Sequence, residues 1–176
     1  MLTKTILLAA LLLVGCSAPV EVSPTSVEHD RTLQFALDGS DVELALARAA
    51  AEIWNATCEG NFVAVRPSSE RVDGDVPMYG QLGLIAGHEI GVTCWRKSGP
   101  KIDVKYVVFQ RDLDPSYDLK FVLAHELGHA LGLPHVEAGL MKPYYDGSWV
   151  APSGGLVPGS ISPEQCAEVE KIAAAR

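Results

Sequence analysis

The stretch 121–141 constrains this chain more than any other, because it places histidines and a glutamate at fixed spacings. It contains the sequence His-Glu-Leu-Gly-His at 125–129. Residues four apart lie on one face of an α-helix, one turn above the other. If the stretch is helical, His125 and His129 can offer two imidazole nitrogens to one metal ion. Glu126 is then not a ligand but points beside the ion, where it can take a proton from metal-bound water.

The residues after this helix supply a third ligand. Gly132 ends the helix, because glycine adopts the left-handed conformation at low cost. Pro134 prevents the helix from resuming, so the chain turns back and His135 can offer a third nitrogen. Three protein ligands leave the fourth position of a tetrahedral site open for water, as in catalytic zinc sites. We predict one Zn²⁺ per chain, since nothing else in the sequence has ligand spacing.

The complete pattern resembles the metzincin clan of zinc endopeptidases, because a methionine, Met141, soon follows the histidines. In metzincins a tight turn carrying this methionine forms a hydrophobic floor beneath the metal. Within the clan the sequence is most similar to matrixins, where a proline follows two residues after the methionine and a tyrosine four after. Pro143 and Tyr145 stand at those positions. The resemblance implies that they form the wall of the pocket for the substrate residue after the cut.

This resemblance, which covers about 31–176, implies a fold and an activity. The fold is α+β: a twisted, mostly parallel sheet with an antiparallel edge strand, two long helices, and a small C-terminal subdomain that ends in a helix. The activity is hydrolysis of peptide bonds in a protein or peptide substrate. Zinc is held by His125, His129 and His135, and Glu126 is the general base. We expect a preference for a medium or large apolar residue just after the cut.

Three alternatives start from the same residues. One is a lipid-anchored zinc-binding or adhesion module without turnover, but metal binding alone does not need the Glu126 carboxylate. Another is a gluzincin-type peptidase with a distant glutamate as third ligand, which His135 and Met141 argue against. The last is an amphipathic core helix with coincidental histidines. It is disfavoured because the His, Glu and Gly spacings all fit at once.

The N-terminus is predicted to be a signal peptide over residues 1–15. Lys4 is followed by an apolar run that is too short to span a bilayer comfortably. The run Leu-Val-Gly-Cys ending at Cys16 resembles a bacterial lipobox, in which the cysteine is lipidated. That resemblance implies an extracytoplasmic protein of the bacterial cell envelope, held to a membrane by its lipid. The alternative is an ordinary signal peptide with an incidental cysteine.

Composition describes the rest of the chain. Residues 16–30 are rich in proline, serine and charge, which predicts a flexible tether. Residues 31–176 are expected to form one catalytic domain and a monomer. An apolar content of 48% is typical of globular proteins. The net charge of −8 argues against a nucleic-acid partner, which would require a basic face.

Hydrophobic periodicity places the expected elements. Strands are predicted at 32–37, 61–66 and 102–109, with one or two more within 79–96 and a polar loop at 67–77. Helices are predicted at 41–55, 115–131 and 163–174. Asp114 followed by proline is the expected start of the second helix.

Three cysteines, Cys58, Cys94 and Cys166, remain if Cys16 is lipidated. An oxidising compartment permits one disulfide among them. Astacins have a cysteine in a place similar to Cys58, bonded to one in the C-terminal helix. That resemblance favours Cys58–Cys166 over Cys58–Cys94, and three free, buried cysteines are the remaining alternative.

Overall fold

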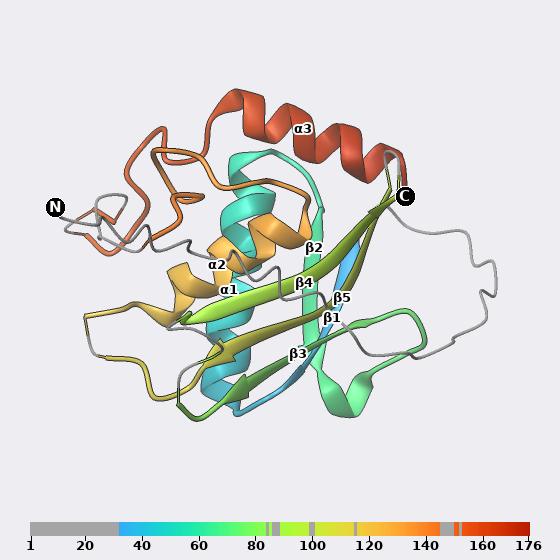
Figure 1. Ribbon diagram of the computed structural model, residues 1–176, viewed down its shortest axis with the longest axis vertical. Coiled ribbons are helices and arrows are strands. Elements are labelled where there is room, and N and C mark those ends of the chain that lie inside the picture. The colour runs from blue at the N-terminus through green and yellow to red at the C-terminus, as the bar shows by residue number, and fades with distance from the viewer. Residues whose placement is uncertain are drawn as a thin grey trace, which may run out of the picture.

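A mixed β-sheet forms the centre of the protein, with helices packed beside it (Figure 1). The computed structural model describes residues 32–83, 85, 89–98, 101–114, 116–144, 150–151 and 153–176. Within these residues one sheet has the strand order β2-β1-β3-β5-β4. Its strands are β1 (Leu33–Asp38), β2 (Val63–Pro67), β3 (Val76–Gln81), β4 (Gly91–Ser98) and β5 (Lys101–Gln110).

Four of these strands are parallel, and β4 alone runs antiparallel to its neighbour β5 at the edge of the sheet. The parallel pair β1 and β2 requires a crossover connection, which α1 (Asp41–Thr57) provides. The hairpin between β4 and β5 needs only a short turn. This arrangement confirms the predicted α+β sheet with an antiparallel edge strand.

The helices follow from local capping signals and apolar faces. Ser40 and Glu43 form a capping box at the start of α1. Ser162 and Gln165 form another at the start of α3 (Pro163–Ala174). The helix α2 (Leu119–Ala130), which carries His125 and His129, is buried along most of its length. Most of such a helix belongs inside the core, and only a few of its residues, His125 and His129 among them, are partly exposed.

Small residues bring α1 close to α2. The buried face of α1 consists of Ala47, Ala50, Ala51 and Trp54. The Trp54 indole Nε1 donates a 2.7 Å hydrogen bond to the carbonyl oxygen of Ala124 in α2. A buried indole N–H needs such a partner. The bond therefore fixes α2 one residue before its first histidine.

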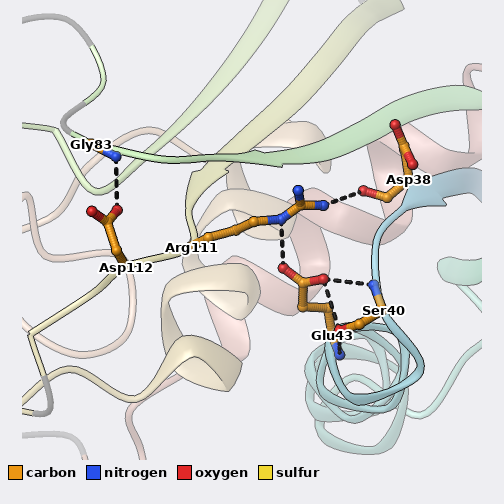
Figure 2. A network of polar contacts seen from close by, with 6 residues as sticks. All are labelled: Asp38, Ser40, Glu43, Gly83, Arg111 and Asp112. Atoms are coloured by element: carbon orange, nitrogen blue, oxygen red, sulfur yellow. Dashed lines mark hydrogen bonds and ion pairs between the residues drawn. The ribbon is translucent and has the colours of Figure 1, made fainter.

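A group of polar contacts lies beyond the ends of the parallel strands β1 and β5 (Figure 2). Arg111 follows β5, and its Nε pairs with Glu43 Oε1 at 2.8 Å while Nη2 donates to the carbonyl of Asp38 at 2.9 Å. Glu43 Oε2 accepts from the backbone N–H of Ser40 at 2.6 Å. We call Asp38, Ser40, Glu43 and Arg111 the Arg111 cluster. It joins the ends of β1 and β5 to the start of α1.

Two predicted boundaries are wrong. The helix α2 begins at Leu119, because Asp118 is its N-cap and accepts from the Lys120 N–H at 2.9 Å. Asp114 instead stabilises a turn, accepting from the Ser116 N–H at 2.8 Å and the Tyr117 N–H at 2.9 Å. The predicted loop 67–77 ends early, since β3 starts at Val76.

Pro77 accounts for the difference at the start of β3. Proline cannot donate a hydrogen bond to a ladder and is rare inside sheets. Here it pairs with Ala36 of β1, and pairing with β5 begins only at Met78. Pro77 therefore lies where β3 has a neighbour on one side only. The predicted segment 79–96 resolves into the end of β3 and the strand β4.

A disulfide joins Cys58, the C-cap residue of α1, to Cys166 of α3, with Cα atoms 5.1 Å apart. This confirms the pairing that the astacin resemblance favoured, so the alternatives with Cys58–Cys94 or three free cysteines are wrong. The bond spans 108 residues. By the loop-entropy relation such a link stabilises a fold by about 4 to 5 kcal/mol. It fastens the C-terminal helix to the main core.

Residues 1–31 lie outside the described part of the chain, and with them the predicted signal peptide, the lipidation site Cys16 and the whole predicted tether 16–30. Among the described residues, no helix is both long and apolar enough to cross a membrane.

Candidate metal centre

Three histidines meet at one point, two from α2 and one from the turn that follows it. The Nε2 atoms of His125 and His129 are 3.1 Å apart, and His135 Nε2 lies 3.2 Å and 3.0 Å from them. Two nitrogens on a tetrahedral zinc ion with bonds of about 2.0–2.1 Å lie about 3.3–3.4 Å apart. The structure thus brings together all three predicted ligands at close to the spacing that zinc requires.

Backbone carbonyls fix the orientation of two of these rings. His125 Nδ1 donates to the carbonyl of Leu140 at 2.7 Å, and His129 Nδ1 donates to that of Leu133 at 2.8 Å. A carbonyl only accepts, so each Nδ1 carries the ring proton and each Nε2 presents a lone pair. Two lone pairs that face each other at 3.1 Å favour a cation between them. An all-imidazole donor set suits zinc.

The environment also keeps these rings neutral, the form that binds metal. The pKa of His129 is lowered to about 4, mainly by burial and also by the neighbouring rings of His125 and His135, against the opposing hydrogen bond to Leu133. Burial likewise lowers the pKa of His125. It also lowers that of His135, although Glu89 acts in the opposite direction. Proton competition for the site is therefore weak near neutral pH.

The end of α2 turns as the sequence predicts. Gly132 has a φ of +97°, its N–H bonds to the carbonyl of His129 at 2.9 Å, and the Leu133 N–H bonds to that of Gly128 at 3.0 Å. These two bonds form a Schellman motif. A side chain at Gly132 would also collide with Ile102 and Ile172. Glycine is thus required for both conformation and space, and the turn returns His135 to the helix.

Met141 lies fully buried against the metal-binding helix. A side chain at Gly128 would collide with the Met141 sulfur, so the methionine packs directly on α2 between the two helical histidines. The turn at 139–142 is closed by a hydrogen bond from the Lys142 N–H to the Gly139 carbonyl at 3.2 Å. The position of this turn against α2 also brings the carbonyl of Leu140 within reach of His125.

Glu126 is almost completely buried, with 5% of its surface exposed. Its pKa is raised to about 7, mainly by burial and also by the charge of Glu89, against the opposing hydrogen bond from Thr93. Thr93 Oγ1 lies 2.7 Å from Glu126 Oε2. A divalent ion at the histidines would lower this pKa, because a nearby cation favours the carboxylate. With the ion bound, the carboxyl group is therefore more readily ionised, which is the form that accepts a proton.

A cavity of about 570 Å³ opens over Glu126 and the three histidines. Strand β4 borders it on one side, and Phe121 and Val122 of α2 give it apolar walls. Pro143 also lines it, whereas Tyr145 lies outside the described residues. Tyr144 is 62% exposed at the rim, beneath the Lys142 ammonium group. The cavity can admit a peptide side chain next to the histidines.

A comparison with protein families identifies the family of this chain. The matrixin family model matches residues 28–152. The chain belongs to the matrixin family. Matrixins are zinc metallopeptidases, and the matched region contains the three histidines and Glu126. It ends before α3 and Cys166. A search of curated proteins finds no match to this chain.

The sequence gives no sign of three residues that shape the site. Trp54 holds α2 through Ala124, and Gly91 and Thr93 of β4 border the Glu126 carboxyl group. Thr93 and Glu126 are separated by 33 residues. No local periodicity reports such a contact, because it depends on how β4 lies over α2.

Proposed function

We propose that this matrixin is an endopeptidase that cleaves protein or peptide substrates, with Glu126 as its general base. The observation that carries the proposal is a buried carboxyl group beside three converging imidazole nitrogens, in one open cavity. Zinc bound there supplies a Lewis acid that polarises the scissile carbonyl and acidifies water. A module that only binds metal would have no use for the carboxyl group.

The residues of the chain divide the work. His125, His129 and His135 would hold the ion, and their hydrogen bonds to backbone carbonyls keep two of the rings in the binding tautomer. Glu126 accepts a proton from the attacking water and donates it to the nitrogen of the departing amine. Burial raises the pKa of this carboxyl group, which makes its carboxylate a better proton acceptor. Met141 supplies the floor below α2 and keeps the histidines apart from solvent on that side.

Substrate binding would use strand β4 and the apolar cavity. One side of β4 pairs with β5, and the described residues place no strand on its other side. An extended peptide can add there by backbone hydrogen bonds. The residue after the cut would enter the cavity beside Val122 and Pro143. We therefore infer a preference for apolar side chains there, with Tyr145 completing the wall as the matrixin resemblance implies.

The remaining proposals rest on sequence. We infer one zinc ion per chain, a monomer, and a lipid on Cys16 that tethers the protein to a membrane of the bacterial cell envelope. The Leu-Val-Gly-Cys run ending at Cys16 supports the anchor. Mass spectrometry of the mature protein tests it: a lipid adduct on an N-terminal Cys16 is expected. A mature N-terminus elsewhere, without the adduct, would remove the anchor from the proposal.

The decisive experiment replaces Glu126 with alanine in the zinc-loaded protein. All three histidines remain, so the zinc content should not change, and α2 should persist because alanine favours helices. General base catalysis contributes about 10²- to 10⁴-fold, so cleavage of casein or a peptide library should fall by that order. Full activity in Glu126→Ala would refute the assigned base. A wild-type chain that binds zinc and cleaves nothing would instead favour the binding module.

A further inference from the structure

The carboxyl group of Glu126 lies in a slot formed by two residues of β4. Thr93 Oγ1 is 2.7 Å from Glu126 Oε2 and 2.8 Å from the Glu126 carbonyl oxygen. A Cβ atom at Gly91 would lie 2.7 Å from Glu126 Oε1 and 2.8 Å from Cγ. Residues two apart in a strand point to the same face. Gly91 and Thr93 therefore both face the carboxyl group of Glu126. Gly91 leaves space for it, and Thr93 donates a hydrogen bond to it.

The hydroxyl group of Thr93 has one proton and two acceptors within reach. The Glu126 carbonyl has its usual partner within α2, as any helix-interior carbonyl has. Within the described part of the chain, no other side chain donates to the Glu126 carboxyl group. A hydrogen bond to an ionised oxygen is also the stronger one. The Thr93 proton therefore points to Oε2 when Glu126 is ionised, and Oε1 stays free to accept a proton.

We propose that Thr93 is a positioning residue that holds the Glu126 carboxylate in its productive rotamer, with Gly91 providing the space that this rotamer needs. The inference rests on the proposed function, because it concerns how the proposed general base, Glu126, is held in position. It also ties the base to β4, the strand proposed to bind substrate. A carboxylate released from Oγ1 can rotate about its terminal bond, since that torsion has a broad potential.

Two substitutions at one position test the hydroxyl group. Thr93→Val keeps the branched shape and loses the donor, whereas Thr93→Ser keeps the donor. Misplacing a reacting group by about 1 Å costs about 100-fold, so Thr93→Val should lose about 10- to 100-fold in kcat and Thr93→Ser only about threefold. Zinc content should not change, because the hydroxyl group of Thr93 bonds to Glu126 and not to a ligand, and the loss should fall on kcat more than on KM. Thr32→Val is the matched control: its hydroxyl bonds to the Asn61 carbonyl at 2.7 Å, away from the cavity, and its loss should leave kcat unchanged.

Gly91→Ala tests the other wall of the slot. The residue has no positive φ, so alanine causes no backbone strain there. Its methyl group would instead press on Oε1 and Cγ of Glu126. We expect a loss in kcat of the same order as in Thr93→Val, again with zinc retained. An unchanged kcat would show that the slot has room to spare and would remove Gly91 from the proposal.

Crystal structures of the zinc-loaded wild type, Thr93→Val and Thr93→Ser give a readout that needs no activity. Glu126 should occupy one rotamer in the wild type and in Thr93→Ser, and a rotated or divided one in Thr93→Val. An unmoved Glu126 in Thr93→Val, equal losses in kcat for valine and serine, or zinc loss in both variants would each overturn the proposal. A zinc-bound wild type without peptidase activity would contradict the proposed function, while the crystals would still decide the position of the carboxylate.

Discussion

The metal centre and the Arg111 cluster are both polar, and both join a helix to neighbouring backbone, yet they differ in how their polar groups are satisfied. In the Arg111 cluster the Arg111 guanidinium and the Glu43 carboxylate face each other and backbone groups (Figure 2). In the metal centre two imidazole lone pairs face each other, and a buried carboxyl group has one donor. This difference indicates their roles. The polar groups of the Arg111 cluster satisfy one another and stabilise the fold, whereas the three histidines of the metal centre can still bind a cation.

His129→Ala should produce the largest effect, because it removes one of three ligands. The zinc content of the purified protein should fall to near background and peptidase activity should disappear, while circular dichroism stays close to that of the wild type. Arg111→Met is the matched control from the other cluster and should keep its zinc. Elemental analysis decides between them. Zinc retained in His129→Ala at the wild-type level would refute the three-histidine centre.

Removing the disulfide should have the next largest effect. Cys58→Ala/Cys166→Ala frees α3 from α1, and loss of a native disulfide typically costs about 2 to 5 kcal/mol of stability. α3 follows Ser160, whose carbonyl accepts from the Leu140 N–H at 2.9 Å, and Leu140 in turn orients His125. Urea unfolding of zinc-free protein measures the loss. An unchanged midpoint would show that packing alone secures the C-terminal helix.

The metal centre could be predicted from sequence because its ligands follow a local rule. His125, His129 and His135 come from one helix and the turn after it, so helical spacing and Gly132 together place them. The boundary of α2 could not be predicted, since Asp114 and Asp118 both carry a capping signal. The structure gives the cap to Asp118 and uses Asp114 in a turn.

Contacts between segments far apart in the chain could not be predicted from the sequence either. The bond from Thr93 to Glu126 joins β4 to α2, and that from Trp54 to Ala124 joins α1 to α2. The Arg111 cluster spans 68 residues between Arg111 and Glu43. Neither hydrophobic period nor motif reports such pairs, because they depend on tertiary packing. The disulfide was reached by resemblance to astacins, not from local pattern.

Arg111→Met should have a smaller effect than either change above. Methionine keeps most of the aliphatic stem, which packs over Gly80, where a Cβ would lie 2.6 Å from Arg111 Cγ. The variant loses a hydrogen bond to the Asp38 carbonyl and a partly exposed ion pair with Glu43, together about 1 to 2 kcal/mol. Urea unfolding of zinc-free protein measures it. A variant as stable as the wild type would mean that the Ser40–Glu43 capping box holds this corner alone.

The smallest expected effect is a change with pH in the stability difference between the wild type and Arg111→Met. It tests the contribution of the Glu43 charge to the cluster. Burial of Glu43 opposes ionisation, but hydrogen bonds from Ser40 and the interaction with Arg111 outweigh it and hold the pKa of Glu43 below its ordinary 4.5. A lowered pKa means that the folded state favours the carboxylate. The stabilisation is then fully present above pH 4.5 and is lost as the pH falls through the folded-state pKa.

Arg111→Met removes one part of that stabilisation, so the stability gap between wild type and variant should narrow below pH 4.5. The narrowing should be a few tenths of a kcal/mol, because partly exposed ion pairs contribute only about 0.2–1 kcal/mol. Urea unfolding of both proteins without zinc, from pH 6 down to pH 3, keeps the histidine centre the same in each. A gap that stays constant over this range would show that Arg111 acts through its bond to the Asp38 carbonyl and not through the charge of Glu43.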